Sequence, residues 1–185
     1  MAKKGKVKVL LEIYKNVETQ QRKGVIEKFD KFFDIEKFDT IIEIGTGNGA
    51  FSVYIAEISK KYGWDFYTYD IIDRKNKETT KELNKCGAKV FIQDVDKTDI
   101  EGIIKSGKRC LILNDGKVKI NDFKRLSPSL KKDDIILSHD YYKNKDNYGP
   151  SYMSLNAVQG HIKKHNLKVV YENLFEKHIW LCVKK

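Results

Sequence analysis

The stretch that decides the fold is the segment 40–49, which reads Thr40-Ile41-Ile42-Glu43-Ile44-Gly45-Thr46-Gly47-Asn48-Gly49. Its first half is a short apolar run typical of a buried strand, and a helical pattern follows from Ala50 to about Lys61. Glycines between a strand and a helix let the backbone turn tightly and approach a ligand closely. The free N–H groups at the start of the helix favour a carboxylate or a phosphate. We therefore expect a strand–loop–helix unit that binds a ligand.

Strands and helices alternate on both sides of this unit. Further helices are predicted over 20–34, 76–86, 99–105, 119–130 and 153–165, and further strands over 65–71, 88–93, 110–113, 134–137, 167–172 and 178–183. Alternation of this kind indicates βαβ units and a mostly parallel sheet covered on both faces. The last two strands are separated only by a short turn and should pair antiparallel. The predicted class is α/β, a Rossmann-like three-layer sandwich with an antiparallel C-terminal hairpin.

Length and composition favour one folded domain over residues 1–185, with an N-terminal helical extension over 1–35 and a core over 36–185. The chain has 185 residues, of which 41% are hydrophobic and 11% aromatic, so it is too apolar for a disordered tail. No apolar run reaches the roughly 18 residues of a membrane span, and no secretory signal is recognisable. Cys86, Cys110 and Cys182 stand apart from one another, as free thiols in a reducing compartment do. We expect a cytoplasmic protein.

The formal net charge of +10 raises the question of a nucleic-acid partner. Only four of the 36 basic residues are arginines, and bidentate phosphate contacts and base readout favour arginine. The lysine excess is compatible with a diffuse solvated surface and with an anion-binding face, and both interpretations stay open.

Two aspartates follow the next two predicted strands. Asp70 ends the strand after the glycine loop, where a carboxylate can accept both hydroxyls of a ribose, and Asp94 ends the third strand, within reach of an adenine edge. The segment Gly45-Thr46-Gly47-Asn48-Gly49-Ala50 also satisfies a loose dinucleotide fingerprint. An NAD-dependent oxidoreductase is thus a second enzyme interpretation, less favoured because the chain leaves no room for a separate substrate domain.

Over residues 36–185 the sequence resembles the class I S-adenosylmethionine-dependent methyltransferases. Their acid-x-Gly-x-Gly-x-Gly motif is matched by Glu43 through Gly49, their ribose-binding acid by Asp70 and their adenine-side acid by Asp94. The resemblance implies a seven-stranded sheet with the last strand antiparallel, and S-adenosylmethionine as cofactor. The cofactor-binding residues that it implies are Glu43, Gly45, Thr46, Gly47, Asn48, Gly49, Asp70, Ile71, Asp94 and Asn114.

The second half is similar to small-molecule O-methyltransferases of the catechol and cephalosporin-hydroxylase-like groups. The similarity rests on Asp115-Gly116, Asp122-Phe123 and His139-Asp140-Tyr141. It implies methyl transfer to a small hydroxylated acceptor and a possible Mg²⁺ held by Asp115 and Asp140. Tyr141 stands where the metal-dependent enzymes have Asn, so hydrogen bonding by the two aspartates is the alternative.

Candidate catalytic residues lie at the same predicted edge of the sheet. His139 could take a proton from a substrate hydroxyl, or serve as a capping or packing residue. Lys117 could orient an anionic substrate, or be one of many solvated lysines. Asp115 and Asp140 complete the expected catalytic group. A loop with Tyr141, Tyr142, Tyr148 and Tyr152 is either a lid or wall of the substrate pocket or an ordinary packed loop.

The expected partner is a small-molecule acceptor, with no membrane partner and no prediction of oligomeric state. Two alternatives from other classes are kept: a nucleic-acid-modifying or basic nucleic-acid-binding protein, which would rest on the charge, and a cofactor-binding protein without catalysis.

Overall fold

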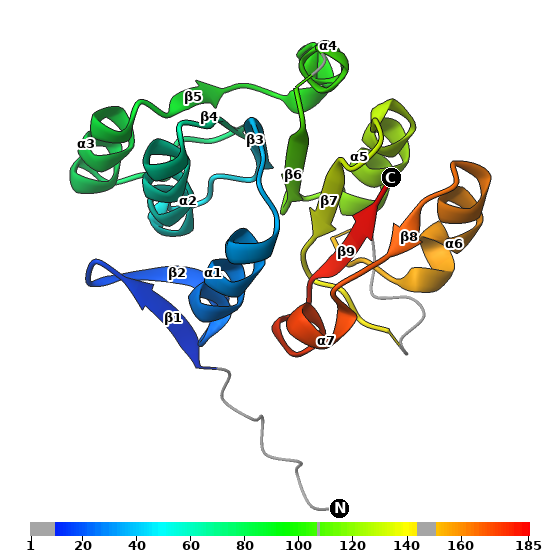
Figure 1. Ribbon diagram of the computed structural model, residues 1–185. Coiled ribbons are helices and arrows are strands. Elements are labelled where there is room, and N and C mark those ends of the chain that lie inside the picture. The colour runs from blue at the N-terminus through cyan, green and yellow to red at the C-terminus, as the bar shows by residue number, and fades with distance from the viewer. Residues whose placement is uncertain (1–9, 107, 144–150) are drawn as a thin grey trace, which may run out of the picture.

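The computed structural model describes residues 10–106, 108–143 and 151–185 (Figure 1). Its main sheet has seven strands, as the resemblance implies, in the order β5-β4-β3-β6-β7-β9-β8. The strands are β3 (Thr40–Ile44), β4 (Asp65–Asp70), β5 (Lys89–Ile92), β6 (Cys110–Asn114), β7 (Ile135–Ser138), β8 (Lys168–Val169) and β9 (Leu181–Lys184). All neighbours from β5 to β7 pair parallel, and β9 runs antiparallel to β7 and β8.

Helices cover both faces of the sheet, which confirms the three-layer prediction. One face packs against α1 (Val25–Ile35), α2 (Ala50–Tyr62), α3 (Lys77–Cys86) and α7 (Glu172–Phe175). The other face packs against α4 (Ile100–Lys105), α5 (Lys119–Leu126) and α6 (Leu155–Lys164). Short 3-10 turns span Val95–Lys97, Ser127–Ser129 and Glu176–His178.

The two cores follow from the alternation of side chains along the buried strands. In β6, Leu111 and Leu113 point into one core, and Cys110 and Ile112 point into the other. The first core is dominated by aromatic rings around Phe29 of α1. All these strand residues are fully buried, so the sheet is the rigid base on which the loops at its edge are built.

The N-terminal extension differs from the prediction. Residues 20–22 are not the start of a helix: β1 (Leu11–Tyr14) and β2 (Val17–Arg22) form an antiparallel hairpin, and α1 begins only at Val25. Lys15 and Asn16 form the two-residue turn, both with positive φ, as hairpin turns of this length require. The apolar residues at helical spacing do form a helix, but this helix begins only after Gly24. The hairpin packs beside α2 (Figure 1).

The C-terminal end also differs in part. The two strands and their antiparallel pairing are confirmed, but the predicted bounds of 167–172 and 178–183 and the short turn between them are wrong. The strand β8 has only two residues, and α7 and a 3-10 turn occupy 172–178. The physical reason is burial: Phe175 of α7 is fully buried among the aromatic rings of α1, which a direct hairpin would leave exposed.

The register of the sheet determines where the site lies. Ile44 pairs with Tyr69 and with Asn114, and Asn114 pairs with Ser138. The loops after β3, β4, β6 and β7 therefore leave the sheet at one edge, which is where ligands bind in open parallel sheets. In the described part of the chain, no helix is long and apolar enough to cross a lipid bilayer.

Candidate active site

A cleft of about 670 Å³ lies at the carboxyl edge of the sheet, and we call it the main cleft. Small-molecule sites usually enclose about 300–1,000 Å³. Nine of the residues predicted as site residues line it: Gly45, Gly47, Asp70, Ile71, Asp94, Asp115, Lys117, His139 and Asp140. The sequence prediction of a single site built from the ends of several strands agrees with this arrangement.

Five other predicted cofactor residues do not line the main cleft. Glu43, Thr46 and Asn114 are buried behind its wall. The Asn48 side chain instead donates to the Glu18 carbonyl oxygen of the hairpin, and Gly49 faces Thr79 of α3. The ligand contacts that the resemblance implies for these five residues stay predictions. Glu43 and Asn114 are buried strand residues, and the Asn48 side chain attaches the glycine loop to the hairpin.

Glu43 lies beneath the glycine loop and joins the elements around it. The residue is 3% exposed, and its carboxylate accepts hydrogen bonds from Ser52 Oγ at 2.5 Å and Thr68 Oγ1 at 2.6 Å. Burial raises the pKa of Glu43 to about 7, against the opposing effect of the two hydroxyl donors. Glu43 thus links β3, β4 and α2 beneath the glycine loop.

Two glycines of the loop are required for close approach. A Cβ at Gly45 would lie 2.5 Å from the carbonyl oxygen of Asp115, and one at Gly47 would lie 2.6 Å from Oε1 of Gln20. Both glycines have positive φ, 98° and 57°. Gly45 therefore brings the loops after β3 and β6 together, and Gly47 lets the hairpin side chain Gln20 close over the loop.

The acids at one end of the main cleft have different partners. Asp70 accepts from the backbone N–H of Gly47 at 2.8 Å, so it fixes the glycine loop while it faces the cleft. Asp94 accepts from the backbone N–H of Asp96 and caps a 3-10 turn. Asp122 of α5 also lines the cleft, with an Oδ2 that is buried and has no hydrogen-bond partner in the described part of the molecule. Burial, together with the nearby Asp96 and Asp94, raises the pKa of Asp122 to about 6 despite Arg125.

The other end of the main cleft holds four charged or ionisable side chains, Asp115, Lys119, His139 and Asp140, which we call the acid–lysine cluster. Lys119 Nζ lies 3.0 Å from Asp140 Oδ2 and 3.3 Å from Asp115 Oδ1, and it donates to the Gly116 carbonyl oxygen at 2.8 Å. The three N–H bonds of one ammonium group can serve these three oxygens. The Lys119 side chain is only 5% exposed.

Asp115 is the common partner within this cluster. Its Oδ1 lies 2.9 Å from His139 Nδ1, and its Oδ2 accepts from Gln21 Nε2 at 2.8 Å. Burial alone would raise the pKa of Asp115, but His139, Lys119 and Gln21 outweigh burial and hold that pKa below its ordinary value. Asp115 is therefore an anion over the physiological pH range.

His139 contacts the cluster through one nitrogen only. Because Asp115 is ionised, Nδ1 carries the proton and donates it to Oδ1. The Nε2 atom is buried without a hydrogen-bond partner in the described part of the structure, and the ring lies against Trp180, with 4.6 Å between ring centroids. Asp140, with a side chain 28% exposed, is the more accessible of the two candidate bases. Its positive φ of 54° is a strained conformation of the kind that concentrates at functional sites.

The predicted proximity of Asp115 and Asp140 is confirmed, because one ligand atom from each and one from His139 lie within 4.8 Å of one another. The cluster does not fit a divalent cation, however. The Lys119 ammonium bonds to both carboxylates. It therefore occupies the place of a metal ion and neutralises the same negative charge. Mg²⁺ would need these oxygens at about 2.0–2.1 Å and would meet a fixed positive charge beside it.

Both roles expected for Lys117, orienting a substrate or standing in solvent, stay predictions. Lys117 is exposed at the rim of the main cleft, and the lysine that reaches the two aspartates is Lys119. The helix rule for residues four apart does not account for this contact, because Asp115 lies in the loop after β6 and α5 begins only at Lys119, so the sequence offered no clear signal for it. Gln20 and Gln21 of the hairpin were missed because that segment was expected to be helical, and Asp122 was quoted only as part of a motif.

The tyrosine-rich loop is described in part. Tyr141 is buried and bridges to Met153, and the rings of Tyr142 and Tyr152 lie 5.9 Å apart. Tyr148 lies outside the described residues. Tyr141 is thus packed and Tyr152 is exposed, and the role of the loop as a lid or wall of the substrate pocket stays a prediction.

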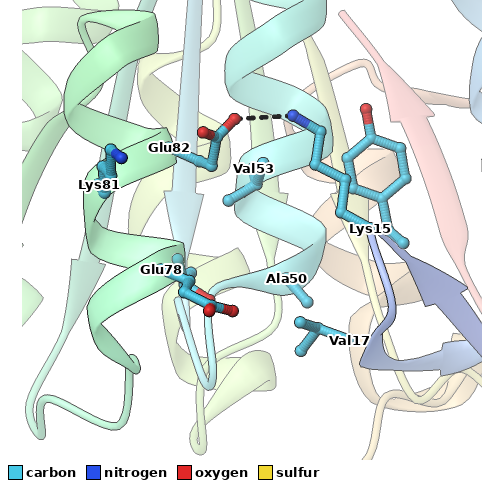
Figure 2. A pocket seen from close by; sticks show the side chains of 9 residues that line it. Lys15, Val17, Ala50, Val53, Glu78, Lys81 and Glu82 are labelled. Atoms are coloured by element: carbon cyan, nitrogen blue, oxygen red, sulfur yellow. Dashed lines mark hydrogen bonds and ion pairs between the residues drawn. The ribbon is translucent and has the colours of Figure 1, made fainter.

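A second cavity, of about 280 Å³, lies between the hairpin and the helices α2 and α3 (Figure 2). Val17, Ala50 and Val53 supply its apolar wall, and Lys15 of the hairpin turn reaches Glu82 of α3 at 2.7 Å. Lys15 also bonds to Glu57 of α2. The ion pairs attach the hairpin to the two helices, so this cavity is best described as part of the hairpin's packing.

Comparison with known proteins gives similarity in structure alone: no family model and no curated protein matches the sequence. The solved structure of CmcI-N160 with SAH (S-adenosylhomocysteine) superposes with a TM-score of 0.67 at 8% identity, over 94% of this chain and 81% of that one. The [4+2]-cyclase SpnF gives 0.57 at 8% identity, over 95% and 86%. The Burkholderia thailandensis 1,6-didemethyltoxoflavin-N1-methyltransferase with bound S-adenosylhomocysteine gives 0.55 at 10% identity, over 87% and 76%.

The fold of this chain is the class I S-adenosylmethionine-dependent methyltransferase fold, with the seven strands and the antiparallel last strand expected of it. The presence of a cyclase among proteins of this fold means that the reaction must be argued from the site and not from the fold.

Proposed function

We propose that this protein transfers a methyl group from S-adenosylmethionine to a hydroxyl group of a small molecule. The observation that carries the proposal is that one cleft joins two sets of residues: Gly45, Gly47 and Asp70 at the loop, and the acid–lysine cluster beyond it. The Asp70 carboxylate can accept from ribose hydroxyls, and it lines the cleft beside Gly45 and Gly47 of the glycine loop, which fits the ribose end of the cofactor. When bound, S-adenosylmethionine would supply the methyl group.

The charge of the main cleft supports this cofactor over NAD. Among the described lining residues, six are aspartates and three are cationic. The aspartates are Asp70, Asp94, Asp96, Asp115, Asp122 and Asp140, and the cations are Arg74, Lys117 and Lys119. An acidic cleft attracts a cationic sulfonium and repels the pyrophosphate of a dinucleotide. The same argument disfavours a nucleic-acid backbone in the cleft, although the whole chain carries +10.

Within the acid–lysine cluster, Asp140 is the group that we assign as proton acceptor. Its carboxylate is partly exposed in the main cleft, whereas Nε2 of His139 is buried. Lys119 holds Asp140 Oδ2, which leaves Oδ1 to take the hydroxyl proton of the acceptor. His139 and Gln21 hold Asp115, whose negative charge balances Lys119.

The cofactor assignment is tested by calorimetry with S-adenosylhomocysteine and with NAD⁺. We expect binding of the former, and binding that is at least about tenfold weaker, a difference of about 1.4 kcal/mol, for the latter. Tighter binding of NAD⁺ would overturn the assignment and favour the oxidoreductase interpretation.

The acceptor class is tested with methyl-labelled cofactor. Label should appear in members of a panel of hydroxylated metabolites and not in bulk RNA or DNA. The net charge of +10 is the observation that favours the second candidate, a nucleic-acid methyltransferase. Label found in nucleic acid, with binding that weakens steeply as salt rises, would establish that candidate instead.

A further inference from the structure

We propose that Lys119 is a built-in cation that replaces a divalent metal in the acid–lysine cluster, and that its removal opens a metal site. Lys119 would act as a positioning residue, through Asp115 and Asp140. The inference places the cluster in the acceptor site proposed above, but its main test measures metal binding and needs neither cofactor nor acceptor.

The contacts of Lys119 are those expected of a cation held between two anions. Its ammonium lies 3.0 Å from Asp140 and 3.3 Å from Asp115, and both partners lie on loops that leave neighbouring strands. A third contact, to the Gly116 carbonyl oxygen, is 2.8 Å long. Oxygen atoms of this kind, two carboxylates and a carbonyl, are also ligands of hard cations.

The rest of the chain holds Lys119 in this position from behind. The carbonyl oxygen of Lys119 accepts a hydrogen bond of 2.8 Å from Nδ2 of Asn114, which is itself fully buried and contacts Ser138. Lys119 is the first residue of α5, so its backbone is fixed by the helix that follows. A buried and anchored ammonium has lost its freedom on folding and costs little further entropy in the reaction.

Charge balance explains why a lysine is needed here. Asp115 and Asp140 are close enough to share one ligand site, and two adjacent carboxylates without a cation would repel each other. Lys119 offsets this repulsion without recruiting an ion from solution. In a catechol-type site, this is the electrostatic role that Mg²⁺ would perform.

Removing the ammonium should leave a usable metal site. In Lys119→Ala, the carboxylates of Asp115 and Asp140 remain, and the His139 ring nitrogen within 4.8 Å of them becomes a ligand when its proton moves to Nε2. Two carboxylates and an imidazole suit Mn²⁺, which electron paramagnetic resonance detects directly. We expect Lys119→Ala to bind Mn²⁺ at least about tenfold more tightly than the wild-type protein. Lys119→Arg keeps the positive charge and should bind it no better than wild type.

Two controls tie the new site to the cluster. Lys117→Ala removes an exposed lysine two positions away and should gain no Mn²⁺ affinity. The double variant Lys119→Ala with Asp140→Asn should lose the gained affinity. If Lys119→Ala is poorly folded, Lys119→Met keeps the apolar stem, and a rise in its melting temperature on addition of Mn²⁺ reports the same binding.

Two results would overturn the inference. One is Mn²⁺ binding to the wild-type protein that Asp140→Asn abolishes, since the metal and the lysine would then coexist. The other is a folded Lys119→Ala or Lys119→Met variant with no gain in Mn²⁺ binding. Failure of the proposed function would appear separately, as failure to bind S-adenosylhomocysteine.

Discussion

The side-chain amide of Gln21 donates a hydrogen bond of 2.8 Å to Asp115, 94 positions further along the chain. Gln21 lies on β2 of the N-terminal hairpin and is 3% exposed, and Asp115 follows the central strand β6. The hairpin lies outside the seven-stranded sheet, yet it completes the hydrogen bonding of the acid–lysine cluster. It is therefore a part of the site and not only a cover for α2.

Replacing Gln21 by Ala should raise the pKa of Asp115 and lower the stability of the protein. The substitution removes one charge-assisted donor, a contact worth about 1.5–3 kcal/mol. Urea unfolding at neutral pH would measure the loss. Gln93→Ala, at an exposed glutamine that also lines the main cleft, is the matched control and should change stability by less than about 0.5 kcal/mol. Equal effects of the two substitutions would contradict the assigned role.

Asp70→Asn should weaken the binding of S-adenosylhomocysteine by roughly 10- to 100-fold, because a ribose hydroxyl bonds better to a carboxylate than to an amide. The asparagine oxygen can still accept from the N–H of Gly47, so the glycine loop is retained. Titration calorimetry measures the affinity. Asp73→Asn changes an exposed acid three residues away and should leave the affinity within about twofold of the wild-type value. An unchanged affinity in Asp70→Asn would remove Asp70 from the ribose site.

Gly45→Ala should destabilise the protein far more than Gly63→Ala. Both glycines have positive φ, so each alanine carries a backbone cost of about 1–2 kcal/mol. A Cβ at Gly63 meets nothing within 4 Å, whereas one at Gly45 would lie 2.5 Å from the Asp115 carbonyl oxygen and must displace the loop after β6. The difference in unfolding free energy between the two variants isolates this clash. Similar values for both would show that the two loops are free to separate.

Glu43→Gln should change how stability depends on pH. The pKa of Glu43 is about 7 in the folded protein, above its ordinary value of 4.5, so the native state binds the proton more tightly than the unfolded chain. This group therefore stabilises the fold less as pH rises from about 4.5 to about 7. Between about pH 5 and pH 8 the free energy of unfolding of the wild type should fall by on the order of 1–3 kcal/mol more than that of Glu43→Gln. Parallel pH profiles for the two proteins would contradict the buried, protonatable state of Glu43.

Asp140→Asn should lower turnover by about 10²–10⁴-fold, the usual cost of removing a positioned base. His139→Gln should cost less, because it removes a partner of Asp115 and leaves the exposed carboxylate in place. Single-turnover methyl transfer to the acceptor found in the labelling experiment measures both. A greater loss in His139→Gln would make the histidine the base and would require its buried Nε2 to become accessible when the acceptor binds.

The sequence by itself determined the architecture of the sheet and the position of the site. Buried strands such as 40–44 are continuous apolar runs, and in a parallel sheet the residues that follow such runs must meet at one edge. Asp70, Asp94 and His139 were therefore placed at one edge from their positions, and Asp115 was added by the resemblance; all four line the main cleft. These predictions depend on local patterns and on a topology that strand–helix alternation restricts to a few choices.

Only the tertiary structure decided which side chains touch. Lys117 and Lys119 are both lysines and lie two positions apart. Because α5 begins at Lys119, the ammonium of Lys119 lies between two aspartates, whereas Lys117 is exposed. Gln21 reaches Asp115 because the hairpin folds back beside α2. Such contacts join residues far apart in sequence or depend on helix boundaries that vary by a residue or two, and neither follows from local periodicity. The expectation of a metal ion depended on such a contact, because the cation between Asp115 and Asp140 is the ammonium of Lys119.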